Sequence, residues 1–171
     1  MKMIIVRHGE AEKDSPTGRD KDRVLTEKGV HDIKKMAEFI KKTPLKINYI
    51  FYSPYKRTEM TAEIFANEFG VTQIQPSDKL LPSEDYGEIC NDLNHFSNSD
   101  TVLIVGHSPD VSYFCSKLIG TGSCSSSCFP AFAFSPGTSV AMNIAKENFI
   151  KGQIIWILSP DYILNEPTNS F

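Results

Sequence analysis

Short apolar runs, separated by segments with helical spacing, restrict what this chain of 171 residues can fold into. Residues 3–6 (MIIV), 47–52 (INYIFY) and 101–105 (TVLIV) are mostly apolar and do not alternate with polar residues. Such runs are typical of strands that are covered on both faces of a parallel sheet. Their alternation with helical segments predicts an α/β fold with helices on both sides of the sheet.

Four helices are expected between and after these runs. The first begins after Thr26, a residue type that caps helix N-termini. The second ends at Gly70, a residue type that suits the last turn of a helix. Residues 84–97 and 109–119 predict a third and a fourth helix.

The last third of the chain has a different pattern. Residues 132–134, 138–144 and 153–158 are apolar runs separated by turn residues, which predicts antiparallel strands. The expected architecture is a three-layer α/β/α sandwich with a mainly parallel sheet and antiparallel edge strands. We expect residues 1–171 to form a single domain, of which the polar residues 165–171 are a frayed tail.

The charge and hydropathy of the chain disfavour several classes of protein. A formal net charge of −3 without a basic stripe creates no field that attracts nucleic acid, so no nucleic-acid partner is expected. The apolar run at the start is too short for a signal peptide, and no stretch is long enough to cross a bilayer. We therefore expect a cytoplasmic protein without a membrane partner.

The four cysteines are too few for a disulfide scaffold at this length, so reduced thiols are expected. Cys124 and Cys128 in GSCSSSCF have a spacing that hints at a metal site. No second pair and no neighbouring histidine accompanies them. A Gly/Ser-rich loop without metal is the favoured interpretation.

Cationic side chains follow each apolar run that is assigned to the parallel sheet. The motifs are RHG (7–9), SPYKR (53–57) and GHSP (106–109). Open α/β sheets bind ligands beyond the carboxyl ends of their strands, where these motifs would meet. In the second and third motifs a serine would cap a helix and a proline would fill its first turn, so two helix N-termini would point at one crevice. Each motif alone is a weak signal, but the three together predict a phosphate site.

Four motifs in this order resemble the histidine phosphatase superfamily, also described as phosphoglycerate mutase-like. They are RHGEAE, LTEKG, SPYKRTEMT and VGHSP. The compact length and the WILSP segment are most similar to the SixA-type phosphohistidine phosphatases of that superfamily. The resemblance implies the sandwich fold and a phosphatase that works through a phosphohistidine on the enzyme, without a metal ion or other cofactor.

The resemblance implies that His8 is the nucleophile that becomes phosphorylated. The rest of the catalytic set would be Arg7, Arg57 and His107. A neutral imidazole is a good nucleophile near pH 7, and two flanking arginines disfavour its charged form. The arginines would also neutralise the equatorial oxygens of the phosphoryl group. The same four residues, together with Ser108, are the expected phosphate-binding residues.

The general acid is less clearly marked. In the acid phosphatase branch of the superfamily an aspartate follows the second histidine, and Ser108 stands there in this chain, which disfavours that branch. Glu84 in LLPSEDYGE is the best positional match to the glutamate donor of other members, with Asp85 beside it. An acidic pair also suits the first turn of a helix, so both interpretations of Glu84 stay open.

Because no strong proton donor is evident, the sequence favours a substrate whose leaving group departs without protonation by the enzyme. The imidazole of phosphohistidine can leave as a neutral ring, whereas an alkoxide needs a strong proton donor. The expected partner is a protein that bears phosphohistidine, such as a phosphorelay histidine domain. The alternatives are a phosphatase or mutase for small phosphate esters and, from another class, a catalytically inactive phosphate-binding module.

Overall fold

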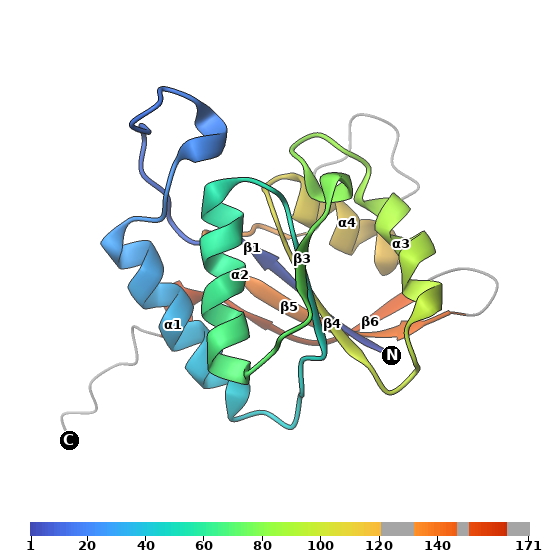
Figure 1. Ribbon diagram of the computed structural model, residues 1–171. Coiled ribbons are helices and arrows are strands. Elements are labelled where there is room, and N and C mark those ends of the chain that lie inside the picture. The colour runs from blue at the N-terminus through green and yellow to red at the C-terminus, as the bar shows by residue number, and fades with distance from the viewer. Residues whose placement is uncertain (121–131, 147–150, 164–171) are drawn as a thin grey trace, which may run out of the picture.

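One mixed sheet forms the middle layer of the protein (Figure 1). The structure is a computed structural model that describes residues 1–120, 132–146 and 151–163. In sheet order the six strands are β3 (Ile74–Pro76), β2 (Tyr49–Tyr52), β4 (Thr101–Gly106), β1 (Lys2–Arg7), β5 (Ser139–Ala145) and β6 (Lys151–Leu158).

The first four strands in that order are parallel, and β5 and β6 are antiparallel to their neighbours. The prediction of a mainly parallel sheet with antiparallel edge strands is therefore confirmed. In the central pair, Arg7 of β1 lies opposite Gly106 of β4. On the other side of β4, Tyr52 of β2 lies opposite Val105. The three strands thus end at the same level, and the residues that follow them lie at one edge of the sheet.

Helices cover both faces of the sheet (Figure 1). One face packs on α1 (Glu27–Lys41), α2 (Lys56–Phe69) and α5 (Pro160–Ile163), and the other on α3 (Ile89–Asp92) and α4 (Asp110–Leu118). Successive residues of β1 alternate between the two cores: Ile4 packs toward α1 and α2, and Ile5 toward α4. Both side chains are fully buried, which explains why the strand is apolar without alternation.

The helix signals of α1, α2 and α4 are confirmed. The Thr26 hydroxyl accepts a hydrogen bond of 2.9 Å from the backbone N–H of Gly29 and caps α1. Gly70 ends α2 in the left-handed conformation with φ 68°, where a residue with a Cβ is strained.

Residues 84–97 do not form the single helix that was expected. They fold into α3 flanked by two 3₁₀ turns, Tyr86–Glu88 and Leu93–His95. The segment contains Gly87 and four Asn or Asp residues at 85, 91, 92 and 94, which are weak helix formers. Its apolar residues still pack on the sheet, so tertiary contacts hold the turns in place.

The strand predicted over residues 132–134 was wrong, and strand β3 was not predicted. Residues 132–134 are irregular, because the Phe134 carbonyl accepts from the Arg7 guanidinium and does not enter the sheet. The short strand β3 had no recognised signal, since it ends in Pro76, a residue type that is confined to sheet edges. Cys124, Cys128 and residues 165–171 lie outside the described residues. In the part of the chain that is described, no helix is long and apolar enough to cross a membrane.

Candidate active site

The carboxyl ends of β1, β2 and β4 surround an open cavity of about 400 Å³. It brings together five predicted site residues: Arg7, His8, Arg57, His107 and Ser108. The other lining residues are Glu10, Ala11, Asp20, Arg23, Tyr55, Pro82 and Pro136. The convergence that the three motifs predicted is thus present in the fold.

His8 has one ring nitrogen held by the main chain and the other beside an arginine. Its Nδ1 lies 2.7 Å from the carbonyl oxygen of Gly9, which can only accept, so Nδ1 carries the hydrogen. Its Nε2 then has a lone pair and accepts from Nε of Arg57 at 3.3 Å. Burial, with the charges of Arg57 and Arg7, lowers the pKa of His8 to about 4. The ring is neutral at physiological pH, as a nucleophile requires.

His107 is buried against β2. Its Nε2 lies 2.8 Å from Oγ of Ser53, and its backbone N–H donates to the Tyr86 hydroxyl at 3.1 Å. Burial first, and then the neighbouring His8 and Arg57, lower the pKa of His107 to about 3. His107 is therefore uncharged while the cavity is empty of anions, and a phosphoryl dianion would favour its protonated, donating form.

Arg57 is the most constrained cation of the cavity, with a side chain only 5% exposed. Its Nε donates to His8, and its Nη1 donates to the backbone carbonyl of Asp20 at 2.9 Å. Its Nη2 pairs with the Asp20 carboxylate at 3.1 Å. The guanidinium also lies 4.7 Å from the centre of the Tyr55 ring, a cation–π contact.

Arg7 reaches the cavity from the last position of β1. One of its terminal nitrogens, Nη1, donates to the carbonyl of Phe134, which fixes the direction of the guanidinium. Its Nε is buried and has no hydrogen-bond partner among the described residues. An unmet N–H is costly unless a ligand satisfies it, and an anion in the cavity is a suitable acceptor.

The serines of the two Ser-Pro motifs do not cap helices, so that prediction was wrong. The N-cap residue of α2 is Tyr55 and that of α4 is Pro109, and neither has a side-chain capping bond. The reason is that both helices begin later than expected, after the proline. Ser53 is instead fully buried and fixes His107, whereas Ser108 is exposed and lines the cavity.

Two glycines of the motifs permit close packing beneath the cavity. A Cβ on Gly9 would lie 2.8 Å from the Ile33 side chain, and a Cβ on Gly29 would lie 2.1 Å from the carbonyl oxygen of Glu10. The backbone N–H of Thr26 donates to that same carbonyl at 3.0 Å. The LTEKG motif therefore seats the start of α1 on the loop that follows His8.

Glu84 does not line the cavity. It is exposed and lies in a separate hollow of about 120 Å³, together with Asp85 and Asp110. Asp85 forms an ion pair of 3.1 Å with Lys117. Asp110 is partly buried and accepts from the backbone N–H of Ser83, and burial raises its pKa.

Sequence reasoning missed the role of three lining residues. Asp20 and Arg23 come from the loop between β1 and α1, at the two ends of a 3₁₀ turn (Asp20–Asp22). No motif singled out that loop, although its dense DKDR sequence was an available signal. Tyr55 was visible in SPYKR, but an aromatic residue in that place gave no sign that it would contact Arg57.

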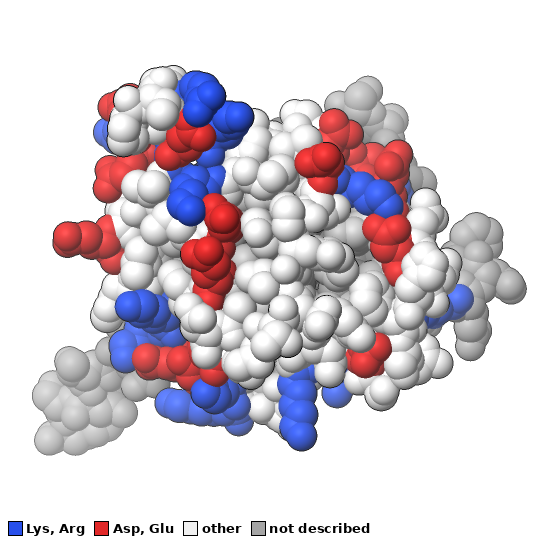
Figure 2. Space-filling model, viewed as in Figure 1, with Lys and Arg blue, Asp and Glu red and all other residues white. Residues whose placement is uncertain are grey.

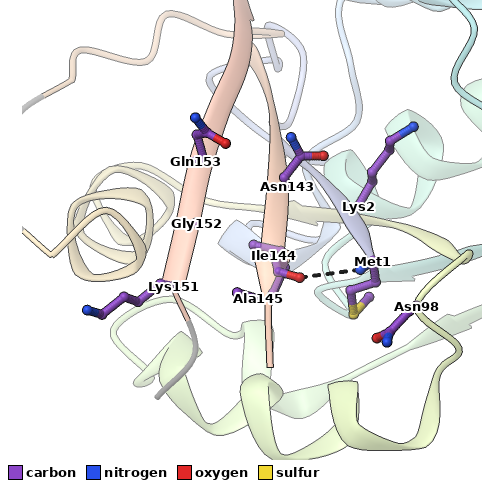
Figure 3. Close-up of a pocket in the computed structure, with 9 residues that line it drawn as sticks. All are labelled: Met1, Lys2, Asn98, Asn143, Ile144, Ala145, Lys151, Gly152 and Gln153. Atoms are coloured by element: carbon purple, nitrogen blue, oxygen red, sulfur yellow. Dashed lines mark hydrogen bonds between the residues drawn. The ribbon is translucent and has the colours of Figure 1, made fainter. Parts of the chain in front are cut away.

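A second hollow, of about 360 Å³, lies at the opposite end of the sheet (Figure 3). It is built from the start of β1 and the ends of β5 and β6 that meet there, and a 3.3 Å hydrogen bond joins the Met1 nitrogen to the Ile144 carbonyl. None of the three strand-end motifs reaches it. Among the described residues there is also no group of three His, Cys, Asp or Glu side chains arranged to hold a metal ion.

A comparison with protein families agrees with this geometry. The model of the histidine phosphatase superfamily (branch 1) matches residues 3–90, about half of the chain. The chain belongs to the histidine phosphatase superfamily. It is therefore a phosphatase of that superfamily, as the four motifs indicated.

Individual relatives point to the same group. The chain is 29% identical, over 94% of both chains, to phosphohistidine phosphatase SixA of Escherichia coli K12. It is 35% identical to a 2,3-bisphosphoglycerate-dependent phosphoglycerate mutase of Rhodopseudomonas palustris BisB18, over 51% of this chain and 44% of the mutase. A solved structure of SixA complexed with tungstate superposes with a TM-score of 0.82 at 25% identity, covering 95% of this chain and 99% of the other. The likeness to SixA is thus confirmed over nearly the whole chain.

Proposed function

We propose that the protein is a phosphohistidine phosphatase that acts on a phosphorylated histidine in another protein. The observation that carries this proposal is the neutral His8, whose Nε2 lone pair lies beside Arg57 in a cavity that Arg7 also lines. The likeness to SixA over nearly the whole chain supports the substrate class.

In the first step Nε2 of His8 attacks phosphorus. The bond from phosphorus to the substrate imidazole breaks, and its electron pair stays on the leaving nitrogen. The substrate ring leaves neutral when its other nitrogen already carries a proton. Arg7 and Arg57 neutralise the three equatorial oxygens, and one such donor is typically worth about 3 kcal/mol in the transition state.

In the second step water attacks the phosphoryl group on His8. The bond between phosphorus and Nε2 breaks, and its electron pair returns to Nε2. One proton of the water goes to solvent or to a phosphate oxygen, and inorganic phosphate leaves. The Gly9 carbonyl holds the proton on Nδ1 throughout, so His8 returns to its starting tautomer.

The placement of the carboxylates favours phosphohistidine over esters. An alkoxide leaving group needs an acid within reach of its oxygen, and the candidate donors Glu84 and Asp110 lie outside the lining of the cavity. The two carboxylates that do line the cavity are already engaged: Asp20 pairs with Arg57 and Arg23, and Glu10 accepts a hydrogen bond from the Thr26 hydroxyl. The cavity is also open, which gives a protein surface access to His8. A phosphorelay histidine domain is the partner we propose.

A substrate panel tests the proposal. It compares a phosphohistidine-bearing protein, phosphoramidate and common phosphate esters, with rapid quench and mass spectrometry of the enzyme. We expect the fastest turnover on phosphohistidine and an acid-labile adduct on His8. The variant His8→Ala should lose the adduct and all turnover, while His31→Ala, on the exposed face of α1, should keep both. An acid-stable adduct on another residue would contradict the mechanism.

The second candidate is a phosphatase or mutase for small esters, with Glu84 as proton donor. The 35% identity to a mutase over half of this chain favours it. If Glu84 serves esters only, Glu84→Gln lowers ester hydrolysis by about 10²–10⁴ and phosphohistidine hydrolysis much less. Asp110→Asn is the matched control from the same hollow, and a larger ester loss there would move the donor role to Asp110.

An inactive phosphate-binding module is the alternative from another class. Binding alone needs no nucleophile, whereas His8 has its tautomer fixed and its pKa lowered. Phosphate binding without turnover of any substrate in the panel would favour the module.

A further inference from the structure

The anion cavity contains an anion of its own. The carboxylate of Asp20 lies in the lining and bridges two guanidinium groups: Oδ2 is 3.1 Å from Nη2 of Arg57, and Oδ1 is 2.7 Å from Nε of Arg23. The loop that carries Asp20 and Arg23 stands at the upper left of Figure 1, and in the same place in Figure 2 acidic and basic side chains lie side by side. Arg57 is thus already paired before a phosphoryl group arrives.

The position of Arg57 does not depend on that carboxylate. Its Nη1 is held by the backbone carbonyl of Asp20, its Nε by His8, and its plane by the ring of Tyr55. The carboxylate adds a negative charge, and the two partners differ in exposure: the Arg57 side chain is 5% exposed and that of Asp20 58%. The side chain of Asp20 is therefore the replaceable member of the pair.

A phosphoryl group that contacts Arg57 must share it with this carboxylate. Two like charges a few ångströms apart repel each other, and removal of one of them strengthens the binding of the other. We propose that Asp20 sets the affinity of the cavity: it weakens the binding of phosphate, so that the product leaves. This inference rests on the proposed function, because it requires the phosphoryl group to bind at Arg57.

Asp20→Asn tests this by removal of the charge with little change in shape. The matched control is Asp22→Asn, which removes the same charge from the same 3₁₀ turn, where Asp22 pairs with Arg19 at 2.7 Å and lies outside the lining. Binding of inorganic phosphate is measured by calorimetry at pH 7, with thermal melting as a check on folding. We expect Asp20→Asn to lower Kd by about three- to tenfold, and Asp22→Asn to leave it nearly unchanged.

Two outcomes of the measurements on Asp20→Asn and Asp22→Asn would overturn the inference. Weaker or unchanged phosphate binding in Asp20→Asn would show that the carboxylate helps to hold the site. Equal tightening in both variants would assign the effect to the overall charge of the loop. If Asp20→Asn melts early, Asp20→Ser gives the same comparison with a smaller side chain. The variant Arg57→Gln separates the two proposals: if it binds phosphate as tightly as the unaltered protein, the anion lies elsewhere and the proposed function fails with the inference.

Discussion

Two histidines of the cavity, the half-buried His8 and the buried His107, are uncharged, and each contacts a different neighbour. The Gly9 carbonyl fixes the tautomer of His8, and Ser53 fixes the ring of His107. Burial is the largest cause of the lowered pKa of both histidines, and the charges of nearby arginines lower it further. The site thus keeps a nucleophile available over the whole physiological range of pH.

The neutrality predicts a distinctive titration by NMR. The imidazole signals of His8 and His107 should not move between pH 8 and pH 5.5, because their pKa values are about 4 and about 3. A saturating amount of inorganic phosphate should raise the pKa of His107, since a nearby dianion favours the charged ring. The signals are assigned with His8→Ala and Ser53→Ala. A midpoint near pH 6.5 in the free protein for either ring would show that burial does not control its charge.

At the scale of elements, the contact between the loop after β1 and the start of α1 holds the site together. The Glu10 carbonyl accepts from the backbone of Thr26 and lies against Gly29. A side chain at position 29 would meet backbone there, and backbone cannot rotate away as a flexible side chain does. Helix α1 therefore fixes the segment that carries His8.

Gly29→Ala tests this contact against simple helix propensity. Propensity predicts that alanine stabilises α1 by up to about 1 kcal/mol. The clash with Glu10 predicts the opposite, a loss of about 2 kcal/mol in the free energy of unfolding, together with lower turnover. Urea denaturation measures the difference, and Lys34→Ala on the exposed face of α1 is the control that should change little. A more stable Gly29→Ala protein would contradict the packing argument.

The elements that the sequence predicted well are those in which one signal dominates. Strands β1 and β4 are buried on both faces and read as unbroken apolar runs, and Thr26 caps α1 by its own side chain. The single helix predicted for residues 84–97 does not form, because the segment contains weak helix formers and its packing on the sheet decides where the turns lie. The role of Ser53 was not predicted, because its partner His107 is 54 positions away in the chain and becomes a neighbour only in the folded sheet.

At the scale of the whole molecule, the two neutral histidines couple stability to pH. The unfolded chain binds protons on histidine near pH 6.5, whereas the folded protein binds them only near pH 4 and below. Between these values the unfolded state holds more protons, so the free energy of unfolding rises with pH in that window and falls as pH is lowered through it.

We expect the free energy of unfolding to drop by about 3 kcal/mol for each of His8 and His107 between pH 7 and pH 4. Urea denaturation at a series of pH values measures this slope. His8→Asn should make the slope shallower, because the group that titrates is gone, and His31→Ala should leave it as it is. Equal slopes in His8→Asn and the unaltered protein would show that other groups cause the acid sensitivity.

The charges that face the phosphoryl group come from the chain itself, which predicts the response to chelators. Arg7 and Arg57 supply the positive charge that phosphoryl transfer requires. Turnover of phosphohistidine should therefore be unchanged after dialysis against EDTA. Loss of activity that Mg²⁺ or Zn²⁺ restores would show that arginine charge is insufficient.

The three different contacts of the Arg57 guanidinium restrict which residue types can replace it in evolution. One planar group reaches the nucleophile, the main chain of a distant loop and the face of an aromatic ring at once. Lysine would keep the positive charge, but a single ammonium on a flexible stem cannot span those directions. Arg57→Lys would therefore keep the charge but lose these contacts. We expect that evolution does not accept even lysine at this position.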